Sequence, residues 1–96
     1  MYNKNMQTTF EWDEQKNRIN IIKHGVSFEE ASRAFFDCNR VLGDDPKHST
    51  ASETRYFLYG DTGNGIVTVR FIIRNGNIRI IGAGYWREGR KKYEQG

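Results

Sequence analysis

A chain of 96 residues with a net charge of +3 has room for one domain with one core. Its single cysteine, Cys38, excludes an internal disulfide and favours a reducing, cytoplasmic compartment. We find no signal peptide, no membrane-spanning run and no histidine with partners at ligand spacing, so we expect no membrane association, no metal and no cofactor. We expect residues 1–9 to be flexible, residues 10–96 to form the domain, and Cys38 to be buried or half-buried.

A first helix is predicted from Asp13 to about Lys23 or His24, after a short strand or extended segment over 10–12. Asp13 is a good N-cap, and Gly25 stands where a glycine commonly ends a helix. One arc of the helical wheel is apolar and should face the core: Trp12, Ile19 and Ile22. The neighbouring arc carries polar groups that can line a cleft: Lys16, Asn20, Lys23 and His24.

A second helix is predicted over 28–36. Ser27 and Glu30 form a capping box, in which the hydroxyl accepts from the amide of residue 30 and the carboxylate reaches back to residue 27. Helical spacing turns Phe28, Ala31 and Phe35 toward the core. Residues 44–49 are expected to form a loop.

Three strands are predicted over 56–59, 66–73 and 78–83, and residues 40–42 fit a fourth. Asn64-Gly65 and Asn75-Gly76 favour two-residue hairpin turns between them. The expected fold class is α+β, with two N-terminal helices packed on an antiparallel sheet of three to four strands. A short C-terminal helix follows over 87–95, weakened at Gly89 by roughly 1 kcal/mol.

The alternation of side chains sorts the two faces of this sheet. Apolar residues should face the helices: Val67, Val69, Phe71, Ile73, Ile78 and Ile80. On the other face, Arg55, Arg70 and Arg79 converge if the register permits, and guanidinium groups match phosphate oxygens. The alternative is an ordinary solvated face, because exposed arginines and lysines are common.

A long motif opens the predicted domain: Phe10-Glu11-Trp12-Asp13, Lys16, Asn20 and Lys23-His24-Gly25-Val26-Ser27-Phe28-Glu29. It continues in three later stretches: Asp45-Pro46-Lys47-His48-Ser49, Arg55 before an apolar strand, and Arg79-Ile80-Ile81. From about Phe10 to Glu94 the chain closely resembles the BrnT-type toxins, ribonucleases of type II toxin–antitoxin systems. The resemblance implies a fold similar to the RelE-like toxins, metal-independent cleavage of RNA and arrest of translation in a bacterial cytoplasm.

The same resemblance implies a partner, a BrnA-like antitoxin with a ribbon-helix-helix DNA-binding domain. A homodimer and a hetero-oligomer with the antitoxin are both open. One position departs from the family, since many members end the last strand with Ile-Ser-Ala-Arg where this chain has Ile81-Gly82-Ala83-Gly84. Either Arg87 or the group Arg90-Lys91-Lys92 supplies the charge instead, or the chain is a weakened nuclease.

RNA carries its own nucleophile, the 2′-hydroxyl, so cleavage needs proton transfer and stabilisation of phosphoryl charge. Imidazole titrates near neutrality, which makes His24 a candidate general acid or base, unranked against His48. The predicted catalytic residues are His24, Lys23, Arg55, Arg70 and Arg79. The predicted RNA-binding residues are Lys16, Asn20, His48, Tyr85 and Arg87. The alternative function is a non-catalytic basic module that docks an antitoxin or RNA.

Overall fold

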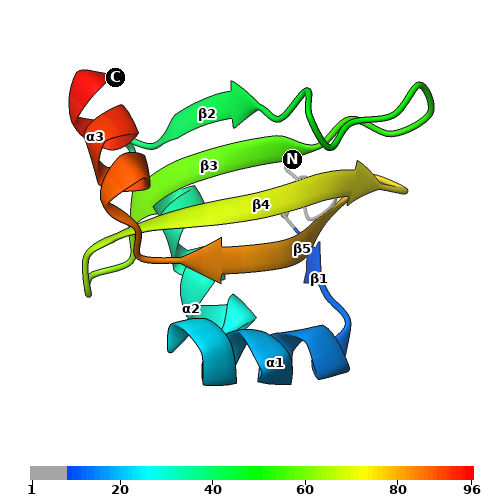
Figure 1. Ribbon diagram of the computed structural model, residues 1–96, viewed down its shortest axis with the longest axis horizontal. Helices are drawn as coiled ribbons and strands as arrows, with labels where there is room; N and C mark the ends of the chain where they lie inside the picture. The colour runs from blue at the N-terminus through cyan, green and yellow to red at the C-terminus, as the bar shows by residue number, and fades with distance from the viewer. Residues whose placement is uncertain (1–8) are drawn as a thin grey trace, which may run out of the picture.

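The computed structural model describes residues 9–96, so nearly all of the segment predicted to be flexible lies outside the described residues. Figure 1 shows the elements of this part in chain order: β1 (Phe10–Glu11), α1 (Glu14–His24), α2 (Phe28–Ser32), the 3-10 helix η2 (Arg33–Phe36), β2 (Val41–Asp44), β3 (Tyr56–Asp61), β4 (Ile66–Arg74), β5 (Asn77–Gly84) and α3 (Arg87–Gln95). The fold class is α+β, as predicted. The second predicted helix is divided, because its last turn is the 3-10 segment η2.

The described residues form one sheet of five strands in the order β1-β5-β4-β3-β2. Strands β2 to β5 are the predicted antiparallel meander, but β1 pairs with β5 in parallel, through Phe10 with Ile78 and Glu11 with Arg79. The expectation of a wholly antiparallel sheet of three to four strands is therefore wrong. Two residues are too few to show an alternation, and their partner lies near the other end of the chain, so no local pattern reveals this pairing.

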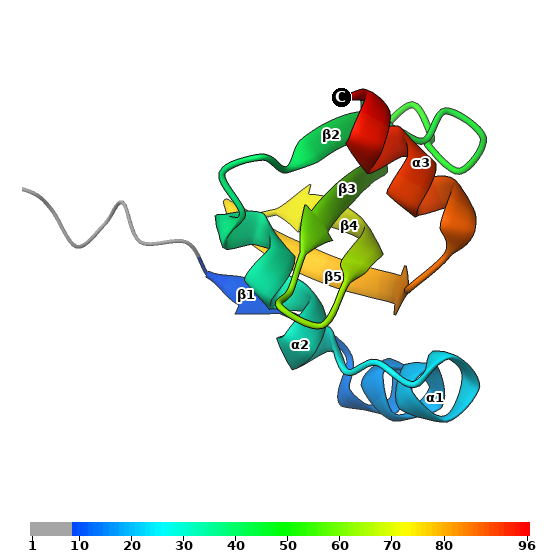
Figure 2. The ribbon, with the colours of Figure 1, turned by 90° about the vertical axis from the view of Figure 1, so that its left-hand side faces the viewer.

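The helices lie around the sheet on three sides. Figure 2 shows α2 and α3 on opposite faces, with α1 beside the β5 edge. The core occupies the face under α2 and η2, where the buried apolar residues gather: Val26, Phe28, Ala31, Ala34, Leu58, Val67, Val69, Phe71, Ile80 and Ala83. The predicted inward face of the long strand is correct for Val67, Val69 and Phe71. Ile73 lies on the same face but is 56% exposed, because no helix covers that end of β4.

The two predicted turns differ. Asn75 and Gly76 both have positive φ, and Arg74 pairs directly with Asn77, so this is the expected two-residue hairpin. The other hairpin pairs Asp61 with Ile66, so its connection holds four residues, 62–65, instead of two. Within it, the Thr62 amide donates to the Gly65 carbonyl at 3.0 Å.

Helix α1 begins as predicted, with the Asp13 carboxylate accepting from the amides of Gln15 and Lys16, and ends at Gly25. Its predicted apolar arc is correct for Trp12, which packs against the core, and wrong for the two isoleucines. Ile22 is 84% exposed and Ile19 is 45% exposed, whereas the buried side chains of the helix are Asn17 and Asn20. The Asn17 side-chain oxygen accepts from the Phe28 amide at 2.8 Å, so α1 is attached largely by hydrogen bonds. A helical wheel assumes apolar attachment and cannot reveal this arrangement.

One of the two hydrogen bonds predicted for the capping box of α2 is present. Ser27 Oγ accepts from the Glu30 amide at 3.0 Å, but the Glu30 carboxylate does not reach back. It accepts instead from the side chains of Asn64 and Tyr85, which belong to distant segments. Those two bonds, that from Tyr85 first, lower the pKa of Glu30. The Glu30 carboxylate therefore bonds to residues from distant segments instead of the nearby amide of Ser27.

Helix α3 lies on the face of the sheet opposite α2. A Cβ at Gly89 would lie 1.8 Å from Thr68 Oγ1 and 3.2 Å from the Tyr59 ring, so only glycine permits this close packing. Gly89 thus lowers the intrinsic stability of the helix, as predicted, and also sets its distance from β3 and β4. This position fixes the segment before α3, including Trp86, over the end of β5.

Two smaller expectations remain. Cys38 is exposed, in contrast to the prediction of a buried or half-buried side chain, because it lies in the connection between η2 and β2. Within residues 9–96, no helix has the length and apolar character needed to cross a bilayer.

Candidate active site

Three arginines share the face of the sheet that α2 leaves open. The register pairs Arg70 with Gly82 and Ile72 with Arg79, so Arg70 and Arg79 point to the same side of β4 and β5. Phe57 lies opposite Arg70, and Arg55, two residues earlier in the same alternation, falls on this side as well. The predicted placement of all three arginines on one face agrees with the register.

One hollow of about 200 Å³ gathers many of the predicted site residues. Its lining combines the polar arc of α1 with β4, the end of β5 and the residue before α3: Lys16, Ile19, Asn20, Lys23, His24, Arg70, Ile81, Gly82, Ala83 and Trp86. We call this the basic hollow. An irregularity in the β4–β5 register beside Arg70 leaves Ile81 without an opposite residue. Such a bulge bends the strand, which helps to shape a concave surface.

Asn20 attaches α1 to the sheet edge. Its Nδ2 donates to the carbonyls of Val26 and Ala83, both at 2.9 Å, and its Oδ1 accepts from the Ala83 amide at 3.2 Å. The Asn20 side-chain amide therefore bonds to both backbone groups of Ala83, as a neighbouring strand would. It does so on the edge of β5 beyond the two residues that pair with β1. Because these bonds occupy both of its polar atoms, we assign Asn20 to positioning the helix. Contact of Asn20 with RNA stays a prediction.

His24 ends α1 at the rim of the basic hollow. Its ring meets the Trp86 indole edge-on, with 5.1 Å between the centroids and 78° between the planes. Lys23 precedes it, and Lys16 lies two turns back on the same side of the helix. An imidazole beside two ammonium groups provides proton transfer and positive charge within one small site.

Arg70 brings a guanidinium to this site from β4. Its Nε is buried and has no hydrogen-bond partner among the described residues, and the same is true of Arg55 Nε. A buried donor without a partner costs free energy, so a bound acceptor would be favoured there. Phosphate oxygens are suited to this position.

The other two predicted catalytic arginines lie outside the lining of the basic hollow. Arg79 donates to Glu11 Oε2 at 3.0 Å and joins β5 to β1. The hydrogen bond from the Asn77 side chain, followed by that from Arg79, lowers the pKa of Glu11. Arg55 also lies on this face but does not line the hollow, so the catalytic set is divided by the structure.

Three predicted RNA-binding residues lie elsewhere. His48 sits in the loop after β2, where Nδ1 is 2.8 Å from the Asp45 carboxylate. Tyr85 and Arg87 line a second hollow of about 610 Å³ beside α3, together with Asn64, Gly65, Ile66, Trp86, Arg90, Lys91 and Glu94. We call it the outer hollow. The Tyr85 hydroxyl donates to Glu30, and burial followed by this bond raises its pKa, so Tyr85 stays protonated.

Trp86 lines both hollows, although it is not among the site residues predicted from the sequence. A Cβ at Gly84 would lie 2.3 Å from the indole, so the ring fills the place of a side chain at that position. This packing of the Trp86 ring over Gly84 depends on the conformation of the turn between β5 and α3, which the sequence does not specify.

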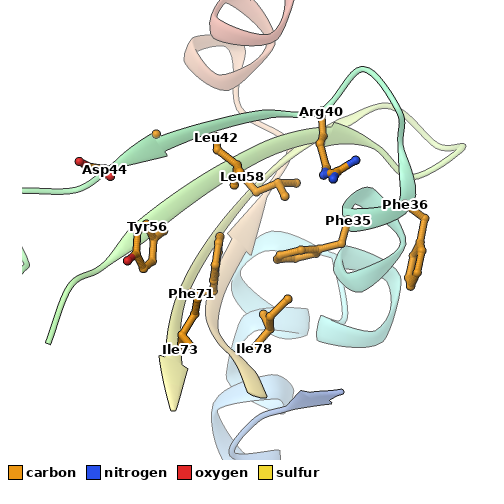
Figure 3. A pocket seen from close by; sticks show the side chains of 11 residues that line it. Phe35, Phe36, Arg40, Leu42, Asp44, Tyr56, Leu58, Phe71, Ile73 and Ile78 are labelled. Carbon is orange, nitrogen blue, oxygen red and sulfur yellow. The ribbon is translucent and has the colours of Figure 1, made fainter. Parts of the chain in front are cut away.

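A third hollow, of about 530 Å³, is apolar and opens on the core side of the sheet (Figure 3). Phe35 and Phe36 of η2 form one wall, and Leu58, Phe71 and Ile78 of the sheet form the other. Among the described residues no cluster of His, Cys, Asp and Glu could hold a metal ion. Of residues 9–96, Arg40 is the only cation in the lining of this hollow, whereas Lys16, Lys23 and Arg70 line the basic hollow.

A comparison with protein-family models shows which family the chain belongs to. The sequence profile described as "Ribonuclease toxin, BrnT, of type II toxin-antitoxin system" matches residues 12–89. The chain belongs to the BrnT family. That family consists of ribonuclease toxins, so RNA is its target and an antitoxin its partner. The match spans α1, the basic hollow and the first residues of α3.

A solved BrnT structure has the same fold. The 1.1 Å crystal structure of the Brucella abortus ribonuclease toxin, BrnT, superimposes with a TM-score of 0.60 at 23% identity, covering 83% of this chain and 97% of that one. At this identity the likeness concerns the fold. No curated protein matches the sequence.

Proposed function

We propose that this protein is a metal-independent endoribonuclease whose active site is the basic hollow. The observation that carries the proposal is the grouping of Lys16, Lys23, His24 and Arg70 around one small cavity. These residues come from two elements far apart in the sequence. Membership in a family of ribonuclease toxins supports RNA cleavage as the reaction.

In the proposed reaction the 2′-oxygen of RNA attacks the adjacent phosphorus. Its proton passes to a base, the P–O5′ bond breaks, and the leaving 5′-oxygen takes up a proton. The products are a 2′,3′-cyclic phosphate and a 5′-hydroxyl, with no oxidation or reduction. We assign the proton transfer to His24, a contribution typically worth about 10²–10⁴-fold in rate.

The cations stabilise the phosphoryl group as negative charge develops on it. Arg70 supplies a guanidinium from β4, because its side chain lines the hollow and its Nε lacks a partner among the described residues. Lys23 and Lys16 add positive charge from α1. We assign Arg55, Arg79 and His48 to the flanking RNA backbone, since they lie outside the basic hollow.

The test is cleavage of RNA by the pure protein in the presence of EDTA. We expect fragments that end in a 2′,3′-cyclic phosphate. Phosphatase should shift these fragments on a denaturing gel only after mild acid has opened the ring. His24→Ala should lower the rate at least about 10²-fold. His48→Ala is the matched control and should lower it much less. Equal losses would remove His24 from the mechanism, and cleavage that stops in EDTA would contradict metal independence.

A second candidate function is a basic module that binds without cleaving. Gly84 favours it, because the residue has no side chain where the family resemblance leads us to expect an arginine. Arg87 and Arg90, the proposed replacements, line the outer hollow and not the basic one. Expression of the chain alone separates the two functions, since a nuclease stops growth and a module does not.

We also propose that cleavage arrests translation in the bacterial cytoplasm, and that a BrnA-like antitoxin with a ribbon-helix-helix domain binds the toxin. The family description supports an antitoxin in general. Similarity to RelE-like toxins and assembly as a homodimer or hetero-oligomer belong to the same proposal. Co-expression with the product of the neighbouring gene tests it, because a cognate antitoxin should copurify and restore growth.

A further inference from the structure

We propose that the Trp86 indole is a stacking platform for a nucleobase next to the cleaved phosphate of single-stranded RNA. This inference rests on the proposed ribonuclease function and names the recognition element of that site. Stacking on an aromatic ring is a general way of holding single strands, because every base has a π-face. The ring is 38% exposed, which leaves surface for a base.

The position of the ring is the first argument. Trp86 lines the basic hollow on one side and the outer hollow on the other, so it forms the ridge between them. A strand with its phosphate at Arg70 and His24 has to cross this ridge to reach Arg87 and Lys91. The base at the crossing then meets the indole.

The second argument is that the ring is held before any ligand arrives. Its underside fills the space above Gly84, where a Cβ would lie within 2.6 Å of three indole atoms. His24 meets the ring edge-on at 5.1 Å, and the Trp86 carbonyl accepts from the Arg90 amide as α3 begins. A ring fixed in this way loses little conformational freedom on binding, which favours affinity.

The third argument is charge. Lys23 and Arg70 lie on one side of the indole, and Arg87, Arg90 and Lys91 lie on the other. Single-strand binding sites combine such a positively charged path with aromatic rings between the cations. Arg90 Nε is paired with Glu94 at 3.2 Å, whereas Arg87 has no salt bridge to the other described residues. Arg87 is therefore the better-placed cation for the next phosphate.

The test is binding of a 2′-O-methyl hexanucleotide, which has no free 2′-hydroxyl and is not cleaved. The Trp12→Phe background leaves Trp86 as the sole tryptophan, because the chain has two. Trp12 packs edge-on against Phe28 and lines neither hollow, so this substitution spares the site. We expect the hexanucleotide to quench the remaining fluorescence.

Two variants separate stacking from packing. Trp86→Leu should weaken hexanucleotide binding about tenfold. Trp86→Phe should recover most of it, and both variants should keep the circular dichroism of the parent. For cleavable RNA, Trp86→Leu should raise KM more than it lowers kcat. Absence of quenching, or equal affinities of the Leu variant and the parent, would overturn the inference.

The inference and the proposed function fail separately. If the parent cleaves RNA while Trp86→Leu binds the hexanucleotide as tightly as the parent, only the stacking platform is wrong. If the hexanucleotide quenches Trp86 while RNA stays uncut, the platform stands and the ribonuclease proposal is wrong. Salt titration is the control for general charge attraction. Added salt should lower the hexanucleotide affinity of the Leu and Phe variants to the same extent.

Discussion

Helices α1 and α2 are neighbours in the chain, but they are attached to the sheet by different forces. Phe28 and Ala31 of α2 are fully buried in the core. α1 instead buries Asn17 and Asn20, and its three isoleucines are 42 to 84% exposed. Apolar contact depends on area and volume, whereas a hydrogen bond also fixes direction and register. The helix that carries Lys16, Lys23 and His24 is thus held where precise placement matters.

The largest expected effect lies on the apolar side of this comparison. Phe28→Ala should cost about 3–5 kcal/mol of unfolding free energy, because it leaves a cavity in the core. Urea denaturation followed by circular dichroism measures this. Phe28→Leu is the control and should cost clearly less. A loss below about 1 kcal/mol would mean that α2 is not held by its apolar face.

The next effect tests the polar attachment. Asn20→Leu keeps a similar volume but leaves the Val26 and Ala83 backbone groups without partners, so it should cost about 2–3 kcal/mol. RNA cleavage should fall further than stability explains, because α1 then loses its register against β5. Asn20→Asp is the comparison variant, since it can accept from the Ala83 amide but cannot donate to either carbonyl. A stabilised Leu variant would contradict the role of the amide.

A smaller effect concerns pH. The pKa of Glu30 is lowered in the folded state by its bonds from Tyr85 and Asn64, so it contributes stability above its unfolded pKa, about 4.3. That contribution disappears as pH falls through the lowered folded value. Glu30→Gln should therefore flatten the loss of stability below pH about 4.5, while Asn20→Leu, which neither adds nor removes a titratable group, should not. Parallel curves for Glu30→Gln and the parent, from thermal melts between about pH 3 and pH 7, would contradict this.

The smallest effect is expected at Ile22, which is 84% exposed. Ile22→Gln should change the unfolding free energy by no more than about 0.5 kcal/mol. Ile80→Val, at a buried site, is the matched control and should cost about 0.5–1.5 kcal/mol. A larger loss at Ile22 than at Ile80 would restore the predicted apolar face of α1.

Local signals were sufficient for much of the fold. Asp13, Ser27 and the Asn75-Gly76 turn act within a few residues of the chain, and the structure confirms what they predict. The partners of Glu30, Asn20 and β1 lie 34 to 68 positions away, and there the predictions failed or were incomplete. Hydrogen bonds between distant segments leave no periodic pattern in the sequence.

The candidate site shows the same division. The polar arc of α1 and the parity of Arg70 were readable from helical and strand periods, and both line the basic hollow. The place of Trp86 was not, because it depends on a turn after β5 and on the missing side chain of Gly84. The role of a residue that lies between two hollows can be predicted only when the tertiary structure is known.

The bond between Asn20 and Ala83 joins positions 63 apart. During synthesis the ribosome therefore releases α1, with its cations, long before the strand on which it docks. A nascent chain has the separate parts of the basic hollow but not the cavity, and contacts of such long range also form slowly. For a ribonuclease toxin this order of assembly delays activity until β5 has left the ribosome.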